Sequence, residues 1–278
     1  MCDTCGCNIT PGNRHLIAEG GKLAPKTGET GAIEILHGLL DENDHQAAHN
    51  RAHFDQRGTL AVNLMSSPGS GKTALLEATI EALRDELNIA VVVGDLETEN
   101  DAIRLRRHGV EALQIATGSA CHLDAHMVHD ALHGMNLDGL DLVFIENVGN
   151  LVCPASFDLG QHANVVLLAS TEGDDKPAKY PVMFRAADLV LLSKADLLPV
   201  LDDFDPRRAE AAVRQLASDA PVTALSATRS QGMSAWLDWL RERLAAHRQN
   251  HPKADAPGHH HHHHHGEPGH THPAASAS

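Results

Sequence analysis

The chain carries the stretch Ser66-Ser67-Pro68-Gly69-Ser70-Gly71-Lys72-Thr73, and this stretch decides the fold class. The apolar run at residues 60–65 before it predicts a buried strand, and residues 74–83 after it predict a helix. A strand, a Gly-rich turn, Gly-Lys-Thr and a helix, in this order, form a phosphate-binding P-loop. We therefore predict an α/β P-loop NTPase fold, in which helices flank a mostly parallel sheet.

Each part of this loop has a physical role in binding a nucleotide. Gly69 and Gly71 let the backbone curl so that successive N–H groups face phosphate oxygens, and the helix N-terminus adds partial positive charge. Lys72 is predicted to reach the β- and γ-phosphates, and the Thr73 hydroxyl to help hold Mg²⁺. The predicted phosphate-binding residues are Pro68, Gly69, Ser70, Gly71, Lys72, Thr73 and Ala74.

One position departs from the usual loop pattern. The pattern G-x-x-x-x-G-K-S/T requires Gly at the position of Ser66, where a small residue still permits the turn. An ordinary Gly/Ser-rich turn before a helix is the alternative, but the strand and the helix on either side favour nucleotide binding.

The composition narrows the classes of protein further. With 278 residues, of which 42% are hydrophobic, the chain can bury the core of one large α/β domain with appendages. The net charge of −15 argues against nonspecific nucleic-acid binding, which needs a basic surface. No run approaches the roughly 20 apolar residues of a membrane span, and no secretory signal follows Met1. We expect a cytoplasmic protein without a membrane or nucleic-acid partner.

The cysteine count points to metal binding rather than to disulfides. The chain has five cysteines, an odd number, and no secretory signal, so a disulfide framework is not expected. The five fall in candidate ligand clusters, at Cys2, Cys5, Cys7, Cys121 and Cys153. The 22 histidines also exceed ordinary usage, and they occur in the body of the chain as well as in its tail.

Three thiols lie close together at the N-terminus, in the pattern Cys2-x-x-Cys5-Gly6-Cys7. Cys-x-x-Cys can hold one metal ion because both sulfurs converge across the turn, and Gly6 lets the third thiol fold back. The α-amino group or a backbone amide nitrogen could complete a square-planar site, which suits Ni²⁺ better than Zn²⁺. Half of a zinc site and a redox pair are the alternatives that fit the triple spacing less well.

Four segments are expected along the chain: a metal-binding N-terminus and linker at residues 1–30, a helical extension at 31–57, the nucleotide-binding domain at 58–248 and a disordered His-rich tail at 249–278. In the extension, His45, His49 and His53 share one face of the predicted helix, and a solvated stripe is our preferred interpretation. The tail is a native metal buffer or a purification tag. Its histidines are His259, His260, His261, His262, His263, His264, His265, His270 and His272.

Acidic residues follow two predicted strands and are candidates for Mg²⁺ binding. Asp95 follows the strand at residues 89–93 and is the first candidate, and Asp101 is the second. A helix N-cap at Thr98 is a compatible alternative for this segment. Glu146 follows the strand at residues 142–145, and Glu146-Asn147-Val148-Gly149 resembles the Asp-x-x-Gly switch of nucleotide hydrolases, with the Gly149 N–H near the γ-phosphate. The predicted catalytic residues are Lys72, Thr73, Asp95 and Glu146, of which Thr73, Asp95 and Glu146 would hold Mg²⁺.

A second group of metal ligands is predicted near this switch. Cys121 and His122 are adjacent at the start of a predicted helix, and Cys153 lies only four residues past Gly149. If the three join, one metal site is tied to the nucleotide-sensing loop; a lone cysteine in the core is the alternative. On the predicted helix, His122, His126, His129 and His133 share one face. They either relay metal or form a polar dimer or solvent face.

The selectivity for the base is predicted from two loops. Lys194 could lie along a purine ring, and the Asp196 carboxylate could accept two N–H bonds that guanine offers and adenine does not. Ser193 stands where Asn or Thr is usual. Ser226 and Ala227, after the strand at residues 222–225, fit a second base-contacting loop.

Together these residues resemble the HypB family of GTPase accessory proteins for nickel insertion into nickel–iron hydrogenase. The resemblance runs from residue 1 to about residue 245. It rests on Cys2-x-x-Cys5-Gly6-Cys7, Asn50-Arg51-x-x-Phe54, residues 66–73, Gly94-Asp95, Cys121-His122-Leu123-Asp124, Glu146-Asn147-x-Gly149-Asn150-Leu151-Val152-Cys153-Pro154 and Glu172-Gly173-Asp174-Asp175-Lys176-Pro177-x-Lys179-Tyr180-Pro181. It departs from the family at Ser193 and in the C-terminal position of its His-rich run.

The resemblance implies a dimerising, SIMIBI-class P-loop GTPase domain with a tight nickel site at the N-terminal cysteines. It implies a second site, for nickel or zinc, at Cys121, His122 and Cys153, at a nucleotide-dependent homodimer interface. A HypA-type nickel accessory protein and the hydrogenase large-subunit precursor are the expected partners. We predict a GTP-hydrolysing nickel metallochaperone that uses Mg²⁺. The alternatives are a nickel store with a vestigial nucleotide site, and an ATP-dependent kinase or ATPase, against which Lys194-x-Asp196 argues.

Overall fold

The computed structural model describes residues 17–18, 22–23, 29–95, 99–118, 120–216 and 218–253, with side chains described from Gly38 onward. The N-terminal metal site predicted at Cys2, Cys5 and Cys7 therefore lies outside the described residues, as does the whole run of tail histidines. Within the described part of the chain, no helix is both long enough and apolar enough to cross a membrane.

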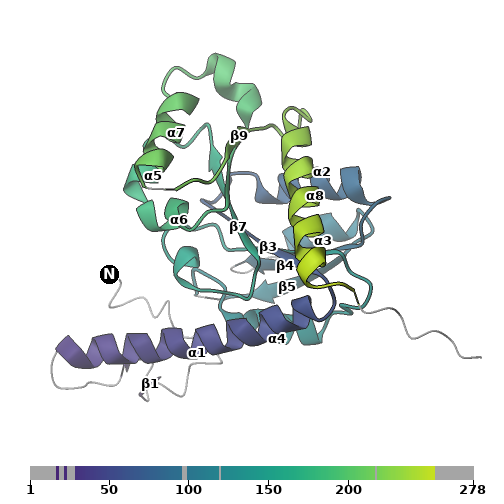
Figure 1. Ribbon diagram of the computed structural model, residues 1–278. Helices are drawn as coiled ribbons and strands as arrows, with labels where there is room; N and C mark the ends of the chain where they lie inside the picture. Colours follow the sequence, from purple (N-terminus) through teal and green to yellow (C-terminus); the bar gives the residue numbers. More distant parts are fainter. Residues whose placement is uncertain are drawn as a thin grey trace, which may run out of the picture.

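A seven-stranded sheet forms the centre of the molecule (Figure 1), with the strand order β5-β4-β6-β3-β7-β8-β9. The strands are β3 Leu60–Ser66, β4 Ile89–Asp95, β5 Glu111–Ala116, β6 Leu142–Glu146, β7 Ala163–Ala169, β8 Leu189–Ser193 and β9 Val222–Ala224. Every neighbouring pair is parallel. The central strands are mostly apolar because helices cover both faces of the sheet, and the two polar exceptions in the interior of these strands, Asn63 of β3 and Asn164 of β7, hydrogen-bond to each other. The predicted α/β fold with a parallel sheet is confirmed.

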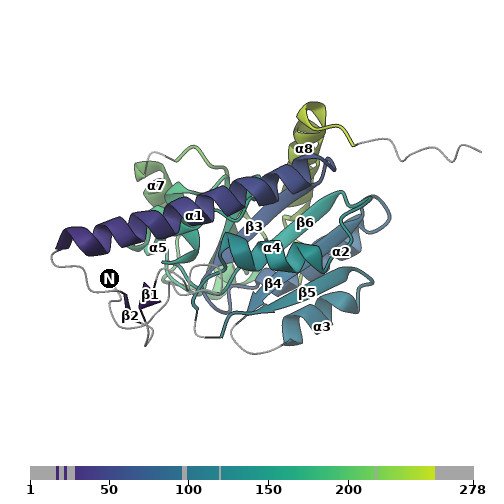
Figure 2. The ribbon, with the colours of Figure 1, turned by 90° about the horizontal axis from the view of Figure 1, so that it is seen from below.

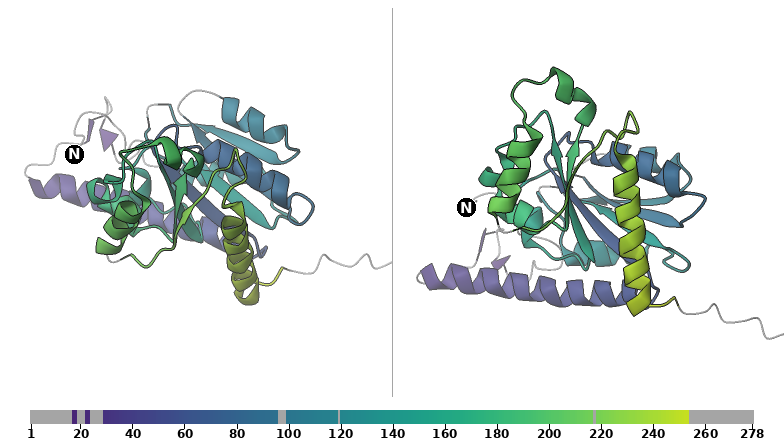
Figure 3. Two further views of the ribbon diagram at one scale, coloured as in Figure 1. Left: turned by 90° about the horizontal axis from the view of Figure 1, so that it is seen from above. Right: turned by 45° about the horizontal axis from the view of Figure 1, so that its top comes forward.

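Eight α-helices and two short 3-10 helices connect the strands in the described residues. They are α1 Glu29–Asp55, α2 Lys72–Leu83, α3 Asn100–Arg106, α4 Ala125–His133, η2 Pro154–Ser156, α5 Lys176–Lys179, α6 Pro181–Arg185, η3 Ala195–Val200, α7 Pro206–Gln215 and α8 Met233–Asn250. One face of the sheet packs against α2, α3 and α8, with Leu75 and Trp236 in the core. Figure 3 shows α8 beside α2, and Trp236 Nε1 donates to Thr79 Oγ1 at 2.8 Å.

The other face of the sheet is covered in two halves. Phe54 of α1 and Val128 of α4 pack on β4 and β6, whereas Phe184 of α6 and Val213 of α7 pack on β7 and β8. Figure 2 shows α1 running along this side of the molecule next to α4. The two helical layers leave the carboxyl ends of the parallel strands free to form a binding site, as in other open α/β sheets.

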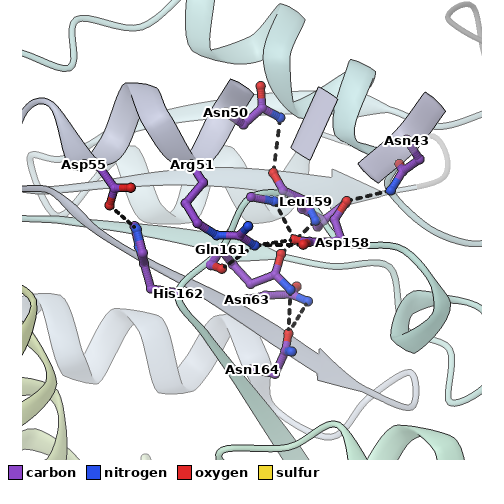
Figure 4. A network of polar contacts seen from close by, with 11 residues as sticks. Asn43, Asn50, Arg51, Asp55, Asn63, Asp158, Leu159, Gln161, His162 and Asn164 are labelled. Carbon is purple, nitrogen blue, oxygen red and sulfur yellow. Dashed lines mark hydrogen bonds and ion pairs between the residues drawn. The ribbon is translucent and has the colours of Figure 1, made fainter. Parts of the chain in front are cut away.

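The helix α1 is fastened to the domain by a network of buried polar contacts (Figure 4). Asn50 Nδ2 donates to the carbonyl oxygens of Ala125 at 2.8 Å and Leu159 at 3.1 Å. The Arg51 guanidinium contacts both carboxylate oxygens of Asp158, at 2.9 and 2.7 Å. Gly160 has a φ of +90°, and a Cβ there would lie 2.6 Å from the Ala47 carbonyl oxygen, so this position requires Gly.

Several element boundaries differ from those that the sequence predicts. A two-residue antiparallel pair, β1 Ile17–Ala18 with β2 Lys22–Leu23, lies in the segment expected to be linker. The helix α4 begins at Ala125, so His122 precedes it instead of lying on its face. The helix α3 has Glu99 at its N-cap, and Thr98 lies outside the described residues.

The chain remains in contact with the domain for a short distance beyond α8, although disorder was expected there. Lys253 Nζ and Arg248 Nη2 both contact Asp141 Oδ1. A Cβ on Gly58 would lie 2.8 Å from the His251 carbonyl oxygen, so the backbone there is close to the end of α1. The packed region therefore extends to Lys253.

Candidate functional site

The loop between β3 and α2 has the backbone geometry of a phosphate cradle. Gly69 and Gly71 have φ values of 75° and 94°, the left-handed region that favours glycine. Lys72 is buried, and its Nζ donates to Ser66 Oγ at 2.9 Å. Ser66, which replaces the usual Gly, thus gives the lysine an oxygen partner.

A cavity of about 390 Å³ opens beside this loop at the carboxyl ends of β3, β4 and β6. Asp95 ends β4 and Glu146 ends β6, so the strand order brings both carboxylates to the loop. The lining residues are Pro68, Gly69, Gly71, Lys72, Thr73, Ala74, Gly94, Asp95, Asp101, Arg104, Glu146, Asn147, Val148 and Gly149. The residues predicted to bind phosphate and Mg²⁺ therefore line one cavity, apart from Ser70. Ser70 lines the smaller hollow next to it.

Glu146 is the buried carboxyl group of this cavity, with 4% of its surface exposed. Thr73 Oγ1 donates to Glu146 Oε1 at 2.8 Å, whereas Glu146 Oε2 is buried without a hydrogen-bond partner among the described residues. Burial raises the pKa of Glu146 to about 7, against the opposing effect of Lys72. Burial also lowers the pKa of Lys72. An unpartnered carboxylate oxygen beside a threonine hydroxyl fits the oxygen ligands that Mg²⁺ prefers.

The loop after Glu146 is pressed against the phosphate-binding loop. A Cβ on Gly149 would lie 2.8 Å from Pro68 Cα and 2.9 Å from Pro68 N, both backbone atoms that cannot rotate away. Position 149 therefore has no room for a side chain, and glycine is the residue that fits there.

A second, smaller hollow lies on the other side of the phosphate loop, where the base was predicted to bind. Its lining residues are Ser70, Gly71, Ala74, Leu75, Ser193, Lys194, Leu225, Ser226, Ala227 and Thr228. Ser193 Oγ donates to the Ser70 carbonyl oxygen at 2.7 Å, so Ser193 ties the base loop to the phosphate loop. Lys194 adopts a φ of 57°. Asp196, the predicted guanine selector, stands in η3 and is not among these lining residues.

Sequence reasoning missed two residues of the nucleotide site. Glu172 follows the carboxyl end of β7, and its Oε1 accepts from Ser70 Oγ of the phosphate loop. Arg104 lines the cavity from α3, where Glu77 and Asp101 hold its guanidinium at 2.6 and 3.2 Å. The available signal for Glu172 was its position after a strand next to β3, but strand order is not readable from one sequence.

Cys121, His122 and Cys153, here called the thiol cluster, lie next to one another, although Cys121 and Cys153 are 32 residues apart in the sequence. Cys121 Sγ lies 2.9 Å from Cys153 Sγ and 3.8 Å from His122 Nδ1, and the three ligand atoms lie within 4.8 Å of one another. His122 stacks on Phe157, with ring centroids 4.0 Å apart. Burial lowers the pKa of His122 to about 4, so its imidazole is neutral at pH 7 and can ligate a metal.

The other histidines are arranged differently from the predicted stripes. His45 and His49 are exposed and His53 is half-buried, as a solvated stripe requires, but the rings of His49 and His53 also contact His129 of α4 at centroid distances of 5.1 and 6.1 Å. His126 also faces α1, but it lies nearer the start of α4, 3.9 Å from Glu42. Burial is the largest cause that lowers the pKa values of His53 and His129.

Asp55, His162 and His247 form another compact group of potential ligands. His162 Nδ1 accepts from the Ala61 N–H at 2.8 Å, so the proton of the neutral ring is on Nε2, which faces Asp55 Oδ1 at 3.1 Å (Figure 4). His162 therefore offers Asp55 a proton instead of offering a metal a lone pair. We interpret Asp55 and His162 as a hydrogen-bonded contact between the end of α1 and the residue before β7, and the ring of His247 from α8 packs against His162 with ring centroids 4.2 Å apart.

The protein is a P-loop nucleotide-binding protein. Its cavity combines a strand, a glycine loop with a buried lysine, and carboxylates at the ends of neighbouring strands. The family follows from comparison with known proteins. The family model for the CobW/HypB/UreG nucleotide-binding domain matches residues 60–224. The chain belongs to this family, among its HypB members.

The similarity to HypB proteins covers most of the chain. The chain is 48% identical over 228 residues to the hydrogenase maturation factor HypB of Escherichia coli K12, covering 82% of this chain and 78% of that protein. The crystal structure of HypB from Helicobacter pylori in complex with nickel matches with a TM-score of 0.71 and 41% identity, over 77% of this chain and 99% of that chain. HypB from Archaeoglobus fulgidus matches with a TM-score of 0.69 and 40% identity, over 74% and 100%.

Proposed function

We propose that this protein hydrolyses GTP and uses the nucleotide cycle to control the delivery of Ni²⁺ for maturation of nickel–iron hydrogenase. One observation carries the proposal: the segment from Glu146 to Cys153 touches both sites. It contacts Thr73 through Glu146, the phosphate loop through Gly149 and Cys121 through Cys153. The names of the similar proteins, hydrogenase maturation factor HypB, and the nickel in the Helicobacter pylori structure support the same function.

In the nucleotide cavity each side chain has an expected task. Lys72 leaves Ser66 and donates to the β- and γ-phosphates, and the backbone N–H groups of the glycine loop hold the phosphate oxygens. Thr73, Asp95 and Glu146 would hold Mg²⁺, which supplies charge neutralisation to the transferring phosphoryl group. Lys194, Ser226 and Ala227 would contact the base. If Asp196 selects guanine, η3 must move toward the base when the nucleotide binds.

In the thiol cluster the metal is cargo. Two thiolates and a neutral imidazole suit nickel or zinc, because both are bound by sulfur and nitrogen. Cys153 is the ligand expected to move, because it ends the segment from Glu146 to Cys153, whose position would respond to the bound nucleotide. We expect the affinity of the cluster for metal to change between the GDP and GTP states. The N-terminal cysteines Cys2, Cys5 and Cys7 are proposed as a second nickel site.

The cellular setting is part of the proposal. A HypA-type nickel protein and the hydrogenase large-subunit precursor would receive the metal, and a homodimer would form in a nucleotide- or metal-dependent manner. We propose that the protein is cytoplasmic and meets the hydrogenase precursor there to deliver nickel.

The test is nickel release from the purified full-length protein to a chromogenic chelator. Release is compared with GDP, GTP, a non-hydrolysable GTP analogue and ATP, for the wild type, Lys72→Ala and the double variant Cys121→Ser/Cys153→Ser. We expect guanine nucleotides to change the release rate of the wild type, and both variants to lose this dependence. Lys176→Ala, a change of a lysine outside both sites, is the matched control.

Two outcomes would reject parts of the proposal. Equal release in every nucleotide state means that the segment does not couple the two sites, and a nickel store becomes the better interpretation. The His-rich composition favours that alternative. An equal response to ATP and GTP would contradict guanine selectivity and favour an ATPase.

A further inference from the structure

Four imidazoles meet where α1 passes α4 (Figure 2), from His49 and His53 of α1 and from His129 and His133 of α4. We call them the histidine cluster. In each helix the two histidines are four residues apart, which places both on one face. These residues belong neither to the nucleotide cavity nor to the thiol cluster.

The nitrogen spacing within each pair matches that of two ligands on one ion. His49 Nε2 and His53 Nε2 are 3.4 Å apart, and His129 Nε2 and His133 Nε2 are 2.9 Å apart. With metal–nitrogen bonds of about 2.0–2.1 Å, two ligands lie about 3.4 Å apart at a tetrahedral angle and about 2.9 Å apart at a right angle. Each helix therefore presents a pair of nitrogens that one ion can bridge.

The two pairs are also close to each other. Ring centroids are 5.1 Å apart for His49 and His129, 6.1 Å for His53 and His129, and 6.5 Å for His53 and His133. Imidazoles that share a tetrahedral ion have centroids about 5 Å apart, so His53 must approach His129 and His133 by about 1–1.5 Å for the two pairs to share one ion. His49 and His133 are exposed, and their side chains are free to adjust with it.

Asn50 sets the tautomer of one of these rings. Its Nδ2 donates to the carbonyl oxygens of Ala125 and Leu159, so Oδ1 is the atom that faces His129 Nδ1, at 3.2 Å. An amide oxygen only accepts, and His129 Nδ1 therefore carries the proton and leaves the Nε2 lone pair facing His133. Histidines that bind metals commonly donate their second N–H to an oxygen in this way.

We propose that His49, His53, His129 and His133 bind one divalent transition-metal ion, which fastens α1 to α4. Four imidazoles without a carboxylate favour nickel, copper or zinc over magnesium or calcium. Because the ligands come from two helices, the complete site exists only while α1 is docked. Binding to the folded state alone raises its stability, so metal at this site should stabilise the protein without any nucleotide.

The experiment measures the rise in melting temperature that Ni²⁺ or Zn²⁺ causes in the full-length chain. Every sample carries Ser at the five cysteine positions, Cys2, Cys5, Cys7, Cys121 and Cys153, so that thiolates do not contribute. The parent is compared with His49→Gln/His53→Gln, with His129→Gln/His133→Gln and with the quadruple variant. The matched control His45→Gln/His108→Gln removes two imidazoles from outside the cluster.

We expect the parent and the control to show a metal-dependent rise of several degrees, and each double variant to lose most of it. Because both pairs would hold the same ion, the quadruple variant should lose no more than either double variant. Additive losses would mean two independent two-histidine sites and would overturn the shared site. An unchanged rise in both double variants would overturn the proposal altogether. The metal-free melting temperature and circular dichroism of each variant show whether it is folded.

Discussion

At the residue scale, Glu146 is the buried carboxyl group that serves the nucleotide cavity at a cost to the metal-free protein. Burial raises its pKa from 4.5 to about 7, so the folded state binds a proton that the unfolded state has already released. For such a group, stability is fully present below the unfolded pKa and is lost as the pH rises through the folded pKa.

Glu146→Gln is therefore expected to stabilise the metal-free protein at pH 8, by roughly 3 kcal/mol in the free energy of unfolding, while it abolishes GTP hydrolysis. Gln keeps an acceptor for Thr73 and carries no charge. Urea unfolding in EDTA at pH 5, 6, 7 and 8 measures the effect. A stability difference between variant and wild type that does not change with pH would contradict this role of the Glu146 charge.

Gly149 allows a second prediction at this scale. Gly149→Ala is expected to cost about 1–3 kcal/mol, because the new Cβ overlaps the backbone of Pro68 and pushes the segment away from the phosphate loop. GTP hydrolysis should fall as well. Gly38→Ala is the control, since nothing lies within 4 Å of its Cβ position in α1 and the change should gain about 0.5–1 kcal/mol. Equal stabilities of the two variants by urea unfolding would refute the overlap.

At the element scale, the docking of α1 on the domain depends mainly on the buried amide contacts of Asn50. Asn50 is fully buried and holds two carbonyl oxygens of other elements, whereas Arg51 and Asp158 are each 36% exposed. Removing a donor from a buried carbonyl costs more than breaking an ion pair that water can reach.

Asn50→Ala is expected to destabilise the protein by about 2–4 kcal/mol, because two buried carbonyl oxygens lose their donor. Arg51→Ala should cost about 1 kcal/mol or less. Urea unfolding measures both, and limited proteolysis shows whether α1 detaches first. A larger cost for the arginine variant would mean that the ion pair, and not the amide, holds the helix.

At the scale of the whole molecule, neutral buried histidines control the response to acid. Burial lowers the pKa values of His122 and His162 to about 4 from 6.5, so the unfolded chain binds more protons than the folded one between these values. Stability from these groups is present above pH 6.5 and is lost as the pH falls toward 4. Among the described groups, Glu146 acts in the opposite direction over this pH range, and the two imidazoles outweigh it.

The wild type is therefore expected to lose stability as the pH falls from 6.5 to 4.5. His162→Gln should flatten this slope by about one proton, because an uncharged donor to Asp55 remains and no ring is left to protonate. Urea unfolding at half-unit pH steps, with His45→Gln as the exposed control, gives the two slopes. Parallel curves for the wild type and His162→Gln would show that this histidine does not set the acid response.

Local sequence patterns were enough to predict the P-loop, the parallel α/β class and the candidate ligands at Cys121, His122 and Cys153. Residues 66–73 carry their signal within eight neighbouring positions, because glycine freedom, a lysine and a helix start are local properties. The mostly apolar strands also followed, since a strand covered on both faces needs apolar residues at successive positions.

Which distant residues meet became clear from the packing of the elements. Glu172 and Ser70 are 102 residues apart, and Asn50 and His129 are 79 apart, yet each pair is in contact. The spacing of histidines on a helix reveals the face they share but not the element that packs against it, so the contact of His49 and His53 with α4 was not predicted. The strand order, which places β6 and β7 on either side of β3, brought the ends of separate segments to one cavity. Such contacts depend on packing between elements, and a single sequence does not encode packing in its local pattern.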